Sequence, residues 1–375
     1  MERAELGDWL RLMLTPGIGS EGARKLLAAF GLPQTLWQQP TAALRQLLSA
    51  TQVDALRTEP ASLAALLTLT LNWLQASPSD GIRRRILVLG DADYPASLLR
   101  IDDPPLMLYL MGNATLTDLT RSVAVVGSRN PSPQGILNAR NFARSLGQAG
   151  VTVVSGLALG IDGAAHEGAL DSLEPGTQRL ATIAVVGTGL DQVYPSRHRE
   201  LAQRIARNGL LISEYPLGTP PLSANFPRRN RILAGLAQGT LVVEAALRSG
   251  SLITARLTAE QGKDVFAIPG SIHAAQARGC HALIKQGAKL VEAVQDVLEE
   301  MNITSPNAAL ASDELPEPAQ GLLDCLGFDP VGLDALQARC GLAMADLQAE
   351  LMALELEGKV ARLPGGLFQR LMPDC

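Results

Sequence analysis

The sequence is poor in the residues that mark several common protein classes. Aromatic residues make up 3 % of its 375 positions, and its four cysteines form no Cys-x-x-Cys pair; they are Cys280, Cys325, Cys340 and Cys375. Without close cysteine spacing the chain has neither a disulfide framework nor the ligand pattern of a zinc finger. This pattern is typical of a protein from a reducing compartment.

The chain also lacks a long hydrophobic run. Its most apolar stretch, residues 63–74, falls short of the roughly 20 residues that cross a bilayer. Residues 1–10 carry acidic side chains and do not have the basic and apolar regions of a secretory signal. We therefore expect a cytoplasmic protein.

The net charge of −5 is unevenly distributed along the chain. Residues 1–80 hold 6 Lys/Arg against 7 Asp/Glu, whereas residues 301–375 hold 4 against 11. Residues 81–300 hold 22 against 19, a net charge of +3. A polyanionic partner is therefore expected to bind the middle of the chain.

Pattern and composition divide the chain into four predicted parts. Residues 1–80 are rich in Leu and Ala with helical periodicity, and residues 81–300 alternate short apolar runs with amphipathic stretches. Residues 301–320 contain Pro, Ser, Ala and acids without an apolar period, which is typical of a linker. Residues 321–375 have the order helix, turn, helix and hairpin that a winged-helix domain shows.

The middle part predicts an α/β fold. Its apolar runs are nearly continuous and most end in Gly or Ser, which favours a Rossmann-like, doubly wound and mostly parallel sheet covered by helices on both faces. The expected strands are residues 86–90, 123–127, 151–156, 181–187, 210–214, 240–245 and 264–270. Such sheets bind their ligands at the carboxyl ends of the strands.

The first part contains a turn-and-helix signal. Residues 16–19 read Pro-Gly-Ile-Gly, and Ser20 is expected to cap the helix that follows. The stretch resembles the hairpin of helix-hairpin-helix modules, in which turn amides and a helix N-terminus face a phosphate. A plain packing element explains the same pattern, because Arg24 and Lys25 are the only cations nearby. Both interpretations stay open.

The second helix of the predicted winged-helix domain would normally enter a DNA groove. In this chain it carries Asp346, Glu350 and Glu355, with no Lys or Arg before Glu357. A helix that cannot neutralise phosphates is a poor groove reader. We expect a protein-contact or regulatory role for it.

No motif in the chain predicts catalysis. Residues 127–135 lack the Gly-Lys-Ser/Thr end of a P-loop, and Gln192 stands where a dinucleotide fingerprint needs its third glycine. The four histidines have no partner at zinc spacing and are expected to be structural; they are His166, His198, His273 and His281. The best acidic candidates are Glu244 and Asp162, and for Asp162 we favour a role as the cap of the following helix. We expect neither an enzyme nor a metal or cofactor site.

Residues 225–231, Asn-Phe-Pro-Arg-Arg-Asn-Arg, combine a ring with three guanidinium groups. If the sheet brings them close to Arg129, the two segments can hold phosphates while Phe226 stacks on a base. Stacking favours a single strand, since duplex bases are not available. The alternative is that Arg229 or Arg231 pairs with an acid, Glu214 or Glu244, and that Phe226 belongs to the core.

With these residues in view, the chain resembles the DprA family (DNA-processing protein A, also called Smf). The matching stretches follow one another in residues 94–112, 123–129, 155–170, 182–198, 213–236, 242–272 and 279–291. The resemblance covers nearly all of residues 81–300, and its most specific pieces are "FPRRNRI" and "SGSLITA". Some family members also carry an N-terminal sterile-alpha-motif-like or helix-hairpin-helix domain and a C-terminal winged-helix domain.

The resemblance implies a recombination mediator rather than an enzyme. Such proteins bind and protect incoming single-stranded DNA in natural transformation, and help to load RecA past single-strand-binding protein. Together with the arginine-rich stretch, it indicates DNA contacts at Gly127, Ser128, Arg129, Ser155, Gly156, Gly187, Phe226, Arg228, Arg229, Asn230, Arg231 and Ser249. Family dimers pair through the last part of the α/β domain, where His281 and Leu290 are the candidates. In one departure, residues 213–231 lack the lysine that some members place near Ser223.

A second hypothesis is a Rossmann-like nucleotide phosphoribohydrolase of the lysine-decarboxylase-like group. Residues 237–246 resemble the motif of that group, Pro-Gly-Gly-x-Gly-Thr-x-x-Glu. The proline and both leading glycines are replaced by Leu236, Ala237 and Gln238. The loop that approaches a nucleotide phosphate is therefore different, which disfavours this alternative.

Overall fold

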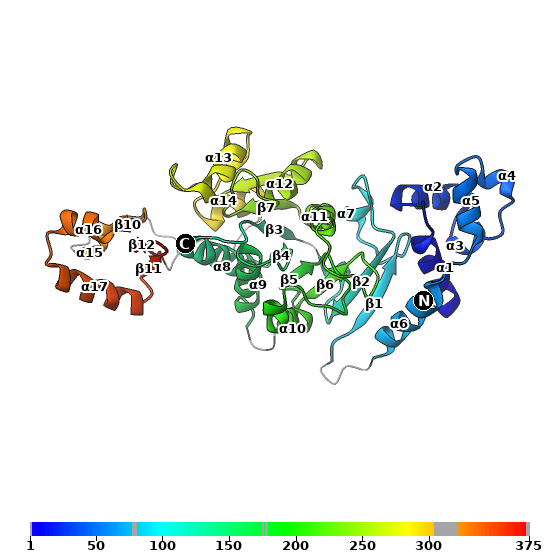
Figure 1. Cartoon of the computed structure of the whole chain (residues 1–375), viewed down its shortest axis with the longest axis horizontal. Coiled ribbons are helices and arrows are strands. Elements are labelled where there is room, and N and C mark those ends of the chain that lie inside the picture. Colours follow the sequence, from blue (N-terminus) through cyan, green and yellow to red (C-terminus); the bar gives the residue numbers. More distant parts are fainter. Residues whose placement is uncertain are drawn as a thin grey trace.

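The structure, a computed structural model, describes residues 2–76, 81–119, 121–174, 176, 179–303 and 321–372. Figure 1 shows a central α/β part with a bundle of short helices at one end and a small C-terminal part at the other. The predicted linker lies outside the described residues from position 304 to 320, and the predicted domain boundaries stay predictions. In the part of the chain that is described, no helix is long and apolar enough to cross a membrane.

The N-terminal part is helical, as the periodicity predicts. Its helices are α1 (Arg3–Leu14), α2 (Ser20–Phe30), α3 (Pro33–Leu36), α4 (Thr41–Leu44), α5 (Ala50–Arg57) and α6 (Leu63–Gln75). The expected cap at Ser20 is wrong: Gly19 occupies the N-cap position, and no side chain caps the helix. Gly17, with φ of 77°, takes the left-handed conformation that the preceding turn requires.

A nine-stranded sheet forms the centre of the molecule, in the order β1-β2-β6-β5-β4-β3-β7-β8-β9. The strands are β1 (Arg84–Val88), β2 (Met107–Gly112), β3 (Ser122–Val126), β4 (Thr152–Ser155), β5 (Thr182–Val185), β6 (Leu210–Ser213), β7 (Gly239–Val242), β8 (Asp264–Ala267) and β9 (Lys289–Leu290). The seven strands from β3 to β9 are parallel, whereas β1 and β2 are antiparallel to their neighbours. This confirms the doubly wound, mostly parallel α/β fold and its seven expected strands.

Helices cover both faces of the sheet. They are α7 (Ala96–Leu99), α8 (Pro133–Gln148), α9 (Ile161–Asp171), α10 (Arg199–Asn208), α11 (Asn225–Leu236), α12 (Ser251–Glu260), α13 (Arg278–Lys285) and α14 (Val294–Glu300). Adjacent residues of one strand join different cores: Val153 packs with residues of α8 and α9, and Val154 packs with residues of α11. This alternation explains why the strands read as continuous apolar runs.

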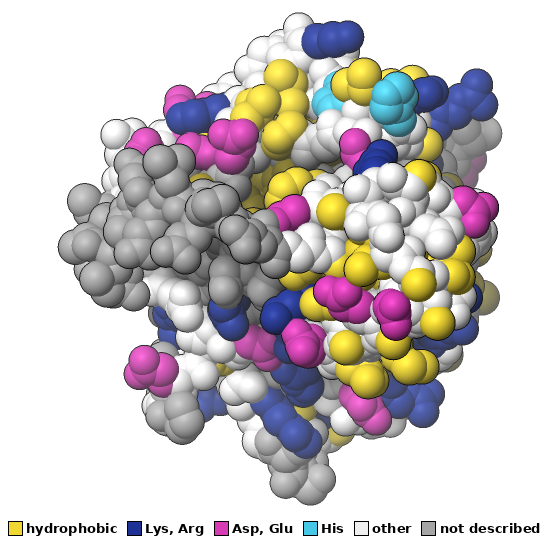
Figure 2. Space-filling model, turned by 90° about the vertical axis from the view of Figure 1, so that its left-hand side faces the viewer, with side chains coloured by type: hydrophobic (Ala, Val, Ile, Leu, Met, Phe, Trp, Pro, Cys, Tyr) yellow, Lys and Arg dark blue, Asp and Glu magenta, His cyan; other side chains and the backbone are white. Residues whose placement is uncertain are grey.

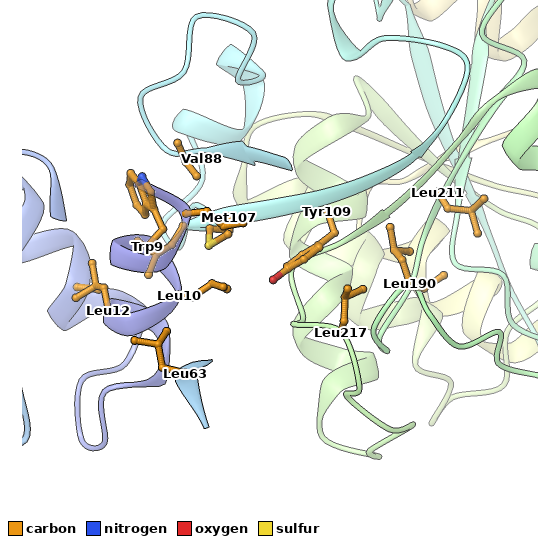
Figure 3. Close-up of a cluster of buried hydrophobic side chains, with 14 of the residues drawn as sticks. Trp9, Leu10, Leu12, Leu63, Val88, Met107, Tyr109, Leu190, Leu211 and Leu217 are labelled. Carbon is orange, nitrogen blue, oxygen red and sulfur yellow. The ribbon is translucent and has the colours of Figure 1, made fainter. Parts of the chain in front are cut away.

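The N-terminal helices pack on the antiparallel hairpin β1–β2. Trp9 of α1 lies in one buried cluster with Val88, Met107 and Tyr109 (Figure 3). The ring of Trp73 meets Tyr109 edge-on, with centroids 5.9 Å apart. The hairpin therefore extends the sheet and joins it to the helical part.

The C-terminal part is a winged helix, as predicted. It contains α15 (Leu322–Leu326), β10 (Val331–Gly332), α16 (Leu333–Cys340), α17 (Met344–Leu356), β11 (Val360–Leu363) and β12 (Leu367–Arg370). Gly341 ends α16 in the left-handed conformation, with φ of 70°, so that the chain turns into α17. The wing, β11–β12, turns at Gly365 and Gly366, which both have positive φ.

Candidate nucleic-acid interface

One cleft of the α/β part lies where the order of the sheet reverses. Strands β3 and β7 are parallel neighbours, but the chain continues from β3 to β4 on one side and from β7 to β8 on the other. Loops that leave two such strands in opposite directions leave a crevice at the carboxyl end of the sheet. A cavity of about 670 Å³ opens there, lined by the loops after β3, β4 and β7 and by the start of α11.

One side of the cavity carries a guanidinium group against a ring. The guanidinium carbon of Arg129, from the loop after β3, lies 5.5 Å from the centre of the Phe226 ring. The Tyr194 ring lies 5.6 Å from the same centre, with the two planes inclined by 39°. The sheet order therefore brings the segments around Arg129 and Phe226 together, as the sequence predicts.

Phe226 is fixed by the start of α11. The helix begins at Asn225, so Phe226 is its second residue, and Pro227 lies in the first turn, where its fixed φ suits the start of a helix. The side-chain amide of Asn225 donates to the carbonyl oxygen of Gly187 at 3.1 Å. A Cβ atom on Gly187 would lie 3.2 Å from the Phe226 ring, so this glycine lets the ring settle against the loop after β5.

Arg229 lines the cavity but is buried and held by partners rather than free. It donates to the carbonyl oxygen of Gly156 at 2.7 Å and to that of Val185, and it lies 4.0 Å from the Asp162 carboxylate. Burial lowers the pKa of Arg229 and raises that of Asp162, while the opposite charges resist both changes. Part of the alternative interpretation is therefore right: this arginine pairs with an acid, although Asp162 is its partner instead of Glu214 or Glu244.

Arg231 points away from the cavity. Its guanidinium donates to both carboxylate oxygens of Glu214, at 2.7 and 2.6 Å, and to Asp103 at 3.0 Å. Asp103 also pairs with Arg24 of α2. The alternative interpretation holds here, since Arg231 links α11 to an acidic pair and, through it, to the N-terminal helices.

Arg228 is exposed and lines a second cleft, of about 840 Å³, together with Arg24, Arg231 and Glu214. The structure therefore does not bring Arg228 to the cavity that Phe226 lines.

The turn before α2 also lines the second cleft, where Arg24 pairs with Asp103. Lys25 pairs with Glu21 at 2.7 Å.

The other predicted contacts divide into lining and support. Gly127, Ser128, Asn230 and Ser249 line the cavity. Ser155 is fully buried and donates to a backbone carbonyl at 2.6 Å, which makes it a support. A Cβ atom on Gly156 would lie 2.1 Å from the Arg229 guanidinium, so only glycine leaves room for that side chain.

Among the lining residues that the sequence prediction missed, Tyr194 and Arg248 have side chains suited to binding DNA. Tyr194, 47 % exposed, supplies a second ring, and Arg248 supplies a second exposed guanidinium. Both residues lie in loops at the carboxyl ends of predicted strands, where a ligand is expected to bind. That position in the sequence is what could have identified them as contact residues. Within the described residues, neither Arg129 nor Arg248 forms an ion pair. They are the free cations of the cavity.

The acidic candidates have structural partners. Glu244 accepts a hydrogen bond from the Ser132 amide at 2.9 Å and lies against the Ser132 hydroxyl at the start of α8. Burial raises the pKa of Glu244, which these hydrogen bonds oppose. Asp162 is not a helix cap, because Gly160 holds that position; it accepts the amide of Ala158 at 3.3 Å.

The histidines do not form a cluster. Nδ1 of His166 lies 2.7 Å from the Thr182 hydroxyl, and burial lowers the pKa of this histidine to about 3. Nδ1 of His198 lies 3.0 Å from the carbonyl oxygen of Leu157. Across the described ranges, no three His, Cys, Asp or Glu side chains lie close enough to hold a metal ion.

The two candidate dimer residues lie near the β9 edge of the sheet. Leu290 in β9 is 43 % exposed. His281 in α13 has its Nε2 atom 2.9 Å from the carbonyl oxygen of Gly270. The structure places both at the same end of the α/β part, and their role in pairing stays a prediction.

Fold and cleft together define the class of protein. It is a Rossmann-like α/β protein whose switch-point cavity offers backbone amides, two free arginines and two rings, and it carries a winged helix after the α/β part. The family model for DNA recombination-mediator protein A matches residues 85–302. The family model for the DprA winged helix domain matches residues 306–366. The chain belongs to the DNA recombination-mediator protein A family.

Individual relatives agree with this assignment. Protein Smf of Escherichia coli K12 is 41 % identical over 300 residues, 77 % of this chain and 78 % of the relative. The X-ray structure of DprA from Streptococcus pneumoniae superposes with a TM-score of 0.60 at 36 % identity and covers 80 % of this chain and 98 % of its own. A Helicobacter pylori DprA structure, described for its single-stranded DNA binding mode, has a TM-score of 0.51 at 31 % identity and covers 58 % of this chain and 96 % of its own.

Proposed function

We propose that this protein is a recombination mediator that binds single-stranded DNA in the switch-point cavity. The observation that carries the proposal is the Arg129 guanidinium 5.5 Å from the Phe226 ring, with Tyr194 beside it, at the rim of that cavity. The single-stranded DNA binding named for the Helicobacter pylori relative supports it.

The chemistry of the cavity favours a single strand. A base stacked on an aromatic ring contributes about 1–3 kcal/mol, but only unpaired bases offer their faces. The free guanidinium groups of Arg129 and Arg248 and the amides of the loop after β3 are suited to backbone phosphates. A duplex could make the phosphate contacts, but its paired bases could not stack on the rings.

The predicted contact residues have three roles in this proposal. Ser128, Arg129, Phe226, Asn230 and Ser249 contact the strand, together with Tyr194 and Arg248. Gly127, Ser155, Gly156, Gly187 and Arg229 shape the cavity. Arg228 contacts a strand only where it leaves the cavity towards the second cleft, and Arg231 holds α11 in place.

The test is a fluorescence-anisotropy titration of a labelled poly-dT strand at two salt concentrations. Arg129→Ala should weaken binding and reduce the salt slope by about one unit for each lost phosphate contact. Phe226→Ala should weaken binding with an unchanged slope, because stacking releases no counterions. Duplex of equal length should bind weakly to all three proteins. Unchanged affinity of both variants for poly-dT would reject the pocket.

The proposal includes the loading of RecA past single-strand-binding protein during DNA uptake, by a homodimer in the cytoplasm. Leu290→Asp should convert a dimer to a monomer in light scattering, since it places a charge at the exposed β9 edge. An unaltered mass would remove this interface. RecA loading is measured as strand exchange on DNA coated with single-strand-binding protein, with and without the wild-type chain.

The proposed mediator role involves no catalysis at the cavity. Hydrogen bonds from Ser132 to Glu244 direct this carboxylate to the start of α8, where a nucleotide phosphate would need the same donors. Release of ribose phosphate from AMP by the purified protein would favour the phosphoribohydrolase alternative.

A further inference from the structure

Helix α17 presents an apolar stripe to solvent on the side away from its own core. Its buried residues are Leu347 and Leu351. The side chains of Ala345, Ala349, Met352 and Leu356 are all exposed, with Met352 at 66 % and Leu356 at 85 %. Spacings of four, three and four residues place these four side chains on one face of the helix.

The stripe borders a groove between α17 and the wing. The groove has a volume of about 550 Å³ and includes Ala349 and Met352 from the stripe. Its opposite side is formed by Arg362, Gly366 and Phe368 of the β11–β12 hairpin. Of the residues that the structure describes, Arg362 is the one Lys or Arg that lines the groove, and it lies on the side formed by the wing, where its guanidinium is 5.8 Å from the centre of the Phe368 ring.

Acidic side chains flank the stripe. Asp346 and Glu350 lie on one side of it and Glu355 on the other, and all three are exposed. Residues 321–372 hold 7 Asp/Glu against 4 Lys/Arg. Figure 2, which views the molecule from this end, shows hydrophobic and acidic side chains next to one another on the surface.

This charge arrangement decides between possible partners. Phosphates of duplex DNA would meet three carboxylates on the helix that normally enters the groove. A second copy docked face to face would place the same carboxylates against each other, which is unfavourable. A partner with cations on either side of an apolar ridge complements both the apolar stripe and the acidic side chains that flank it.

We propose that the face of α17 that carries Ala345, Ala349, Met352 and Leu356 docks an amphipathic helix of another protein, whose apolar ridge is flanked by Lys and Arg. The four-three-four spacing is that of a helix–helix seam, in which small residues let a partner approach and larger ones insert between its side chains. Met352 and Leu356 are the anchors, and the acids set the orientation and select against acidic partners.

Two synthetic peptides of about three heptads test the proposal. Both have the same Leu/Ala ridge, one flanked by Lys and the other by Glu. The full chain should bind the Lys-flanked peptide at least about tenfold more tightly in fluorescence anisotropy, a difference of about 1.4 kcal/mol. Added salt should reduce this preference.

Two variants locate the binding. Met352→Asp and Leu356→Asp should each weaken binding of the Lys-flanked peptide by about tenfold or more, because each places a charge within the apolar seam. Both side chains are largely exposed, so the melting temperature should stay close to that of the wild type. Leu32→Asp is the matched control, since this leucine is 53 % exposed but lies in the N-terminal part, and its peptide binding should equal that of the wild type.

Three results would overturn the proposal. The first is equal affinity for the two peptides, or no binding of either, and the second is wild-type peptide binding by both stripe variants. The third is a different occupant. A fall in oligomeric mass on Leu356→Asp would assign the stripe to a second copy, and duplex binding lost on Arg362→Ala would assign the domain to DNA.

Discussion

Helix α11 and helix α17 both stand at positions that the sequence associates with nucleic-acid binding, and their surfaces are opposite. Helix α11 begins with three arginines in the segment 225–231. Helix α17 occupies the groove-reading position of a winged helix but carries three acids and no Lys or Arg. The first lies at the switch-point cavity, whereas the second forms one side of an apolar groove.

The number of charged residues in a helix differs from the number of charged side chains that are exposed and unpaired, and only the latter can bind a charged partner. In α11, Arg229 is held by Asp162 and two carbonyl oxygens, and Arg231 by Glu214 and Asp103. Only Arg228 of the three is exposed, and it faces the second cleft. In α17, by contrast, all three acids are exposed and form no ion pair within the described residues.

The largest expected effect is a loss of folding stability when a buried, ion-paired arginine is removed. Arg229→Ala leaves the buried Asp162 carboxylate without its counter-charge and two carbonyl oxygens without a donor, which costs about 3–5 kcal/mol of folding stability. A marked fall in the thermal midpoint of the α/β part should follow, measured by differential scanning calorimetry.

Arg228→Ala is the matched control for this loss. The change removes the neighbouring arginine, which is exposed, and should alter stability by less than about 0.5 kcal/mol. A wild-type midpoint for Arg229→Ala would show that the buried arginine does not stabilise α11, and the distinction between held and free arginines would fail.

The second effect concerns the ring that adjoins α11. Tyr194→Ala should weaken poly-dT binding by about 1–3 kcal/mol, or about 5- to 150-fold, since it removes one face on which a base can stack. Its ring contacts Phe226, so the double variant with Phe226→Ala should lose less than the sum of the two single losses. Fluorescence anisotropy measures all three, and Tyr194→Phe should bind as the wild type. A strictly additive pair would contradict a shared stacking platform.

Most of the fold could be predicted from the sequence, because its buried parallel strands are nearly continuous apolar runs. Two strands were not predicted. Strand β9 has only two residues, and β2 follows a proline-rich stretch and pairs antiparallel with β1 and β6. Among the described residues, no α-helix stands between β2 and β3 in the chain, and β9 is too short to leave an apolar run in the sequence.

The site could be predicted only in part. The meeting of Arg129 and Phe226 follows from strand-end loops at a reversal of the sheet order, which the motifs anticipate. The burial of Arg229 depends on Asp162, a residue that is distant in sequence and reaches the arginine only through the packing of α9 against the sheet. Long-range pairing of this kind leaves no local pattern, so the free and held arginines could not be told apart.

A smaller effect is expected from a free cation outside α11. Arg248→Ala should reduce the salt slope of poly-dT binding by about 0.7–1 unit, with a loss of affinity at low salt that shrinks as salt is added. Arg256→Ala is the control, because this arginine is also exposed but lies on α12 outside the cavity and pairs with Glu260. Equal slopes for the two variants would remove Arg248 from the interface.

The smallest effect is expected from reversing charge on α17. Asp346→Lys combined with Glu350→Lys should give the chain weak, salt-sensitive duplex affinity, with a slope steeper by about two units, since two cations replace two acids at the groove-reading position. Single-stranded binding at the cavity should not change. Asp54→Lys with Glu59→Lys, both exposed in the N-terminal part, controls for net charge alone. If only the α17 pair binds duplex in an electrophoretic shift assay, the acids are what keep this winged helix from DNA. If neither pair binds, the shape of the apolar stripe excludes the duplex even without the acids, and charge is not what separates α17 from α11.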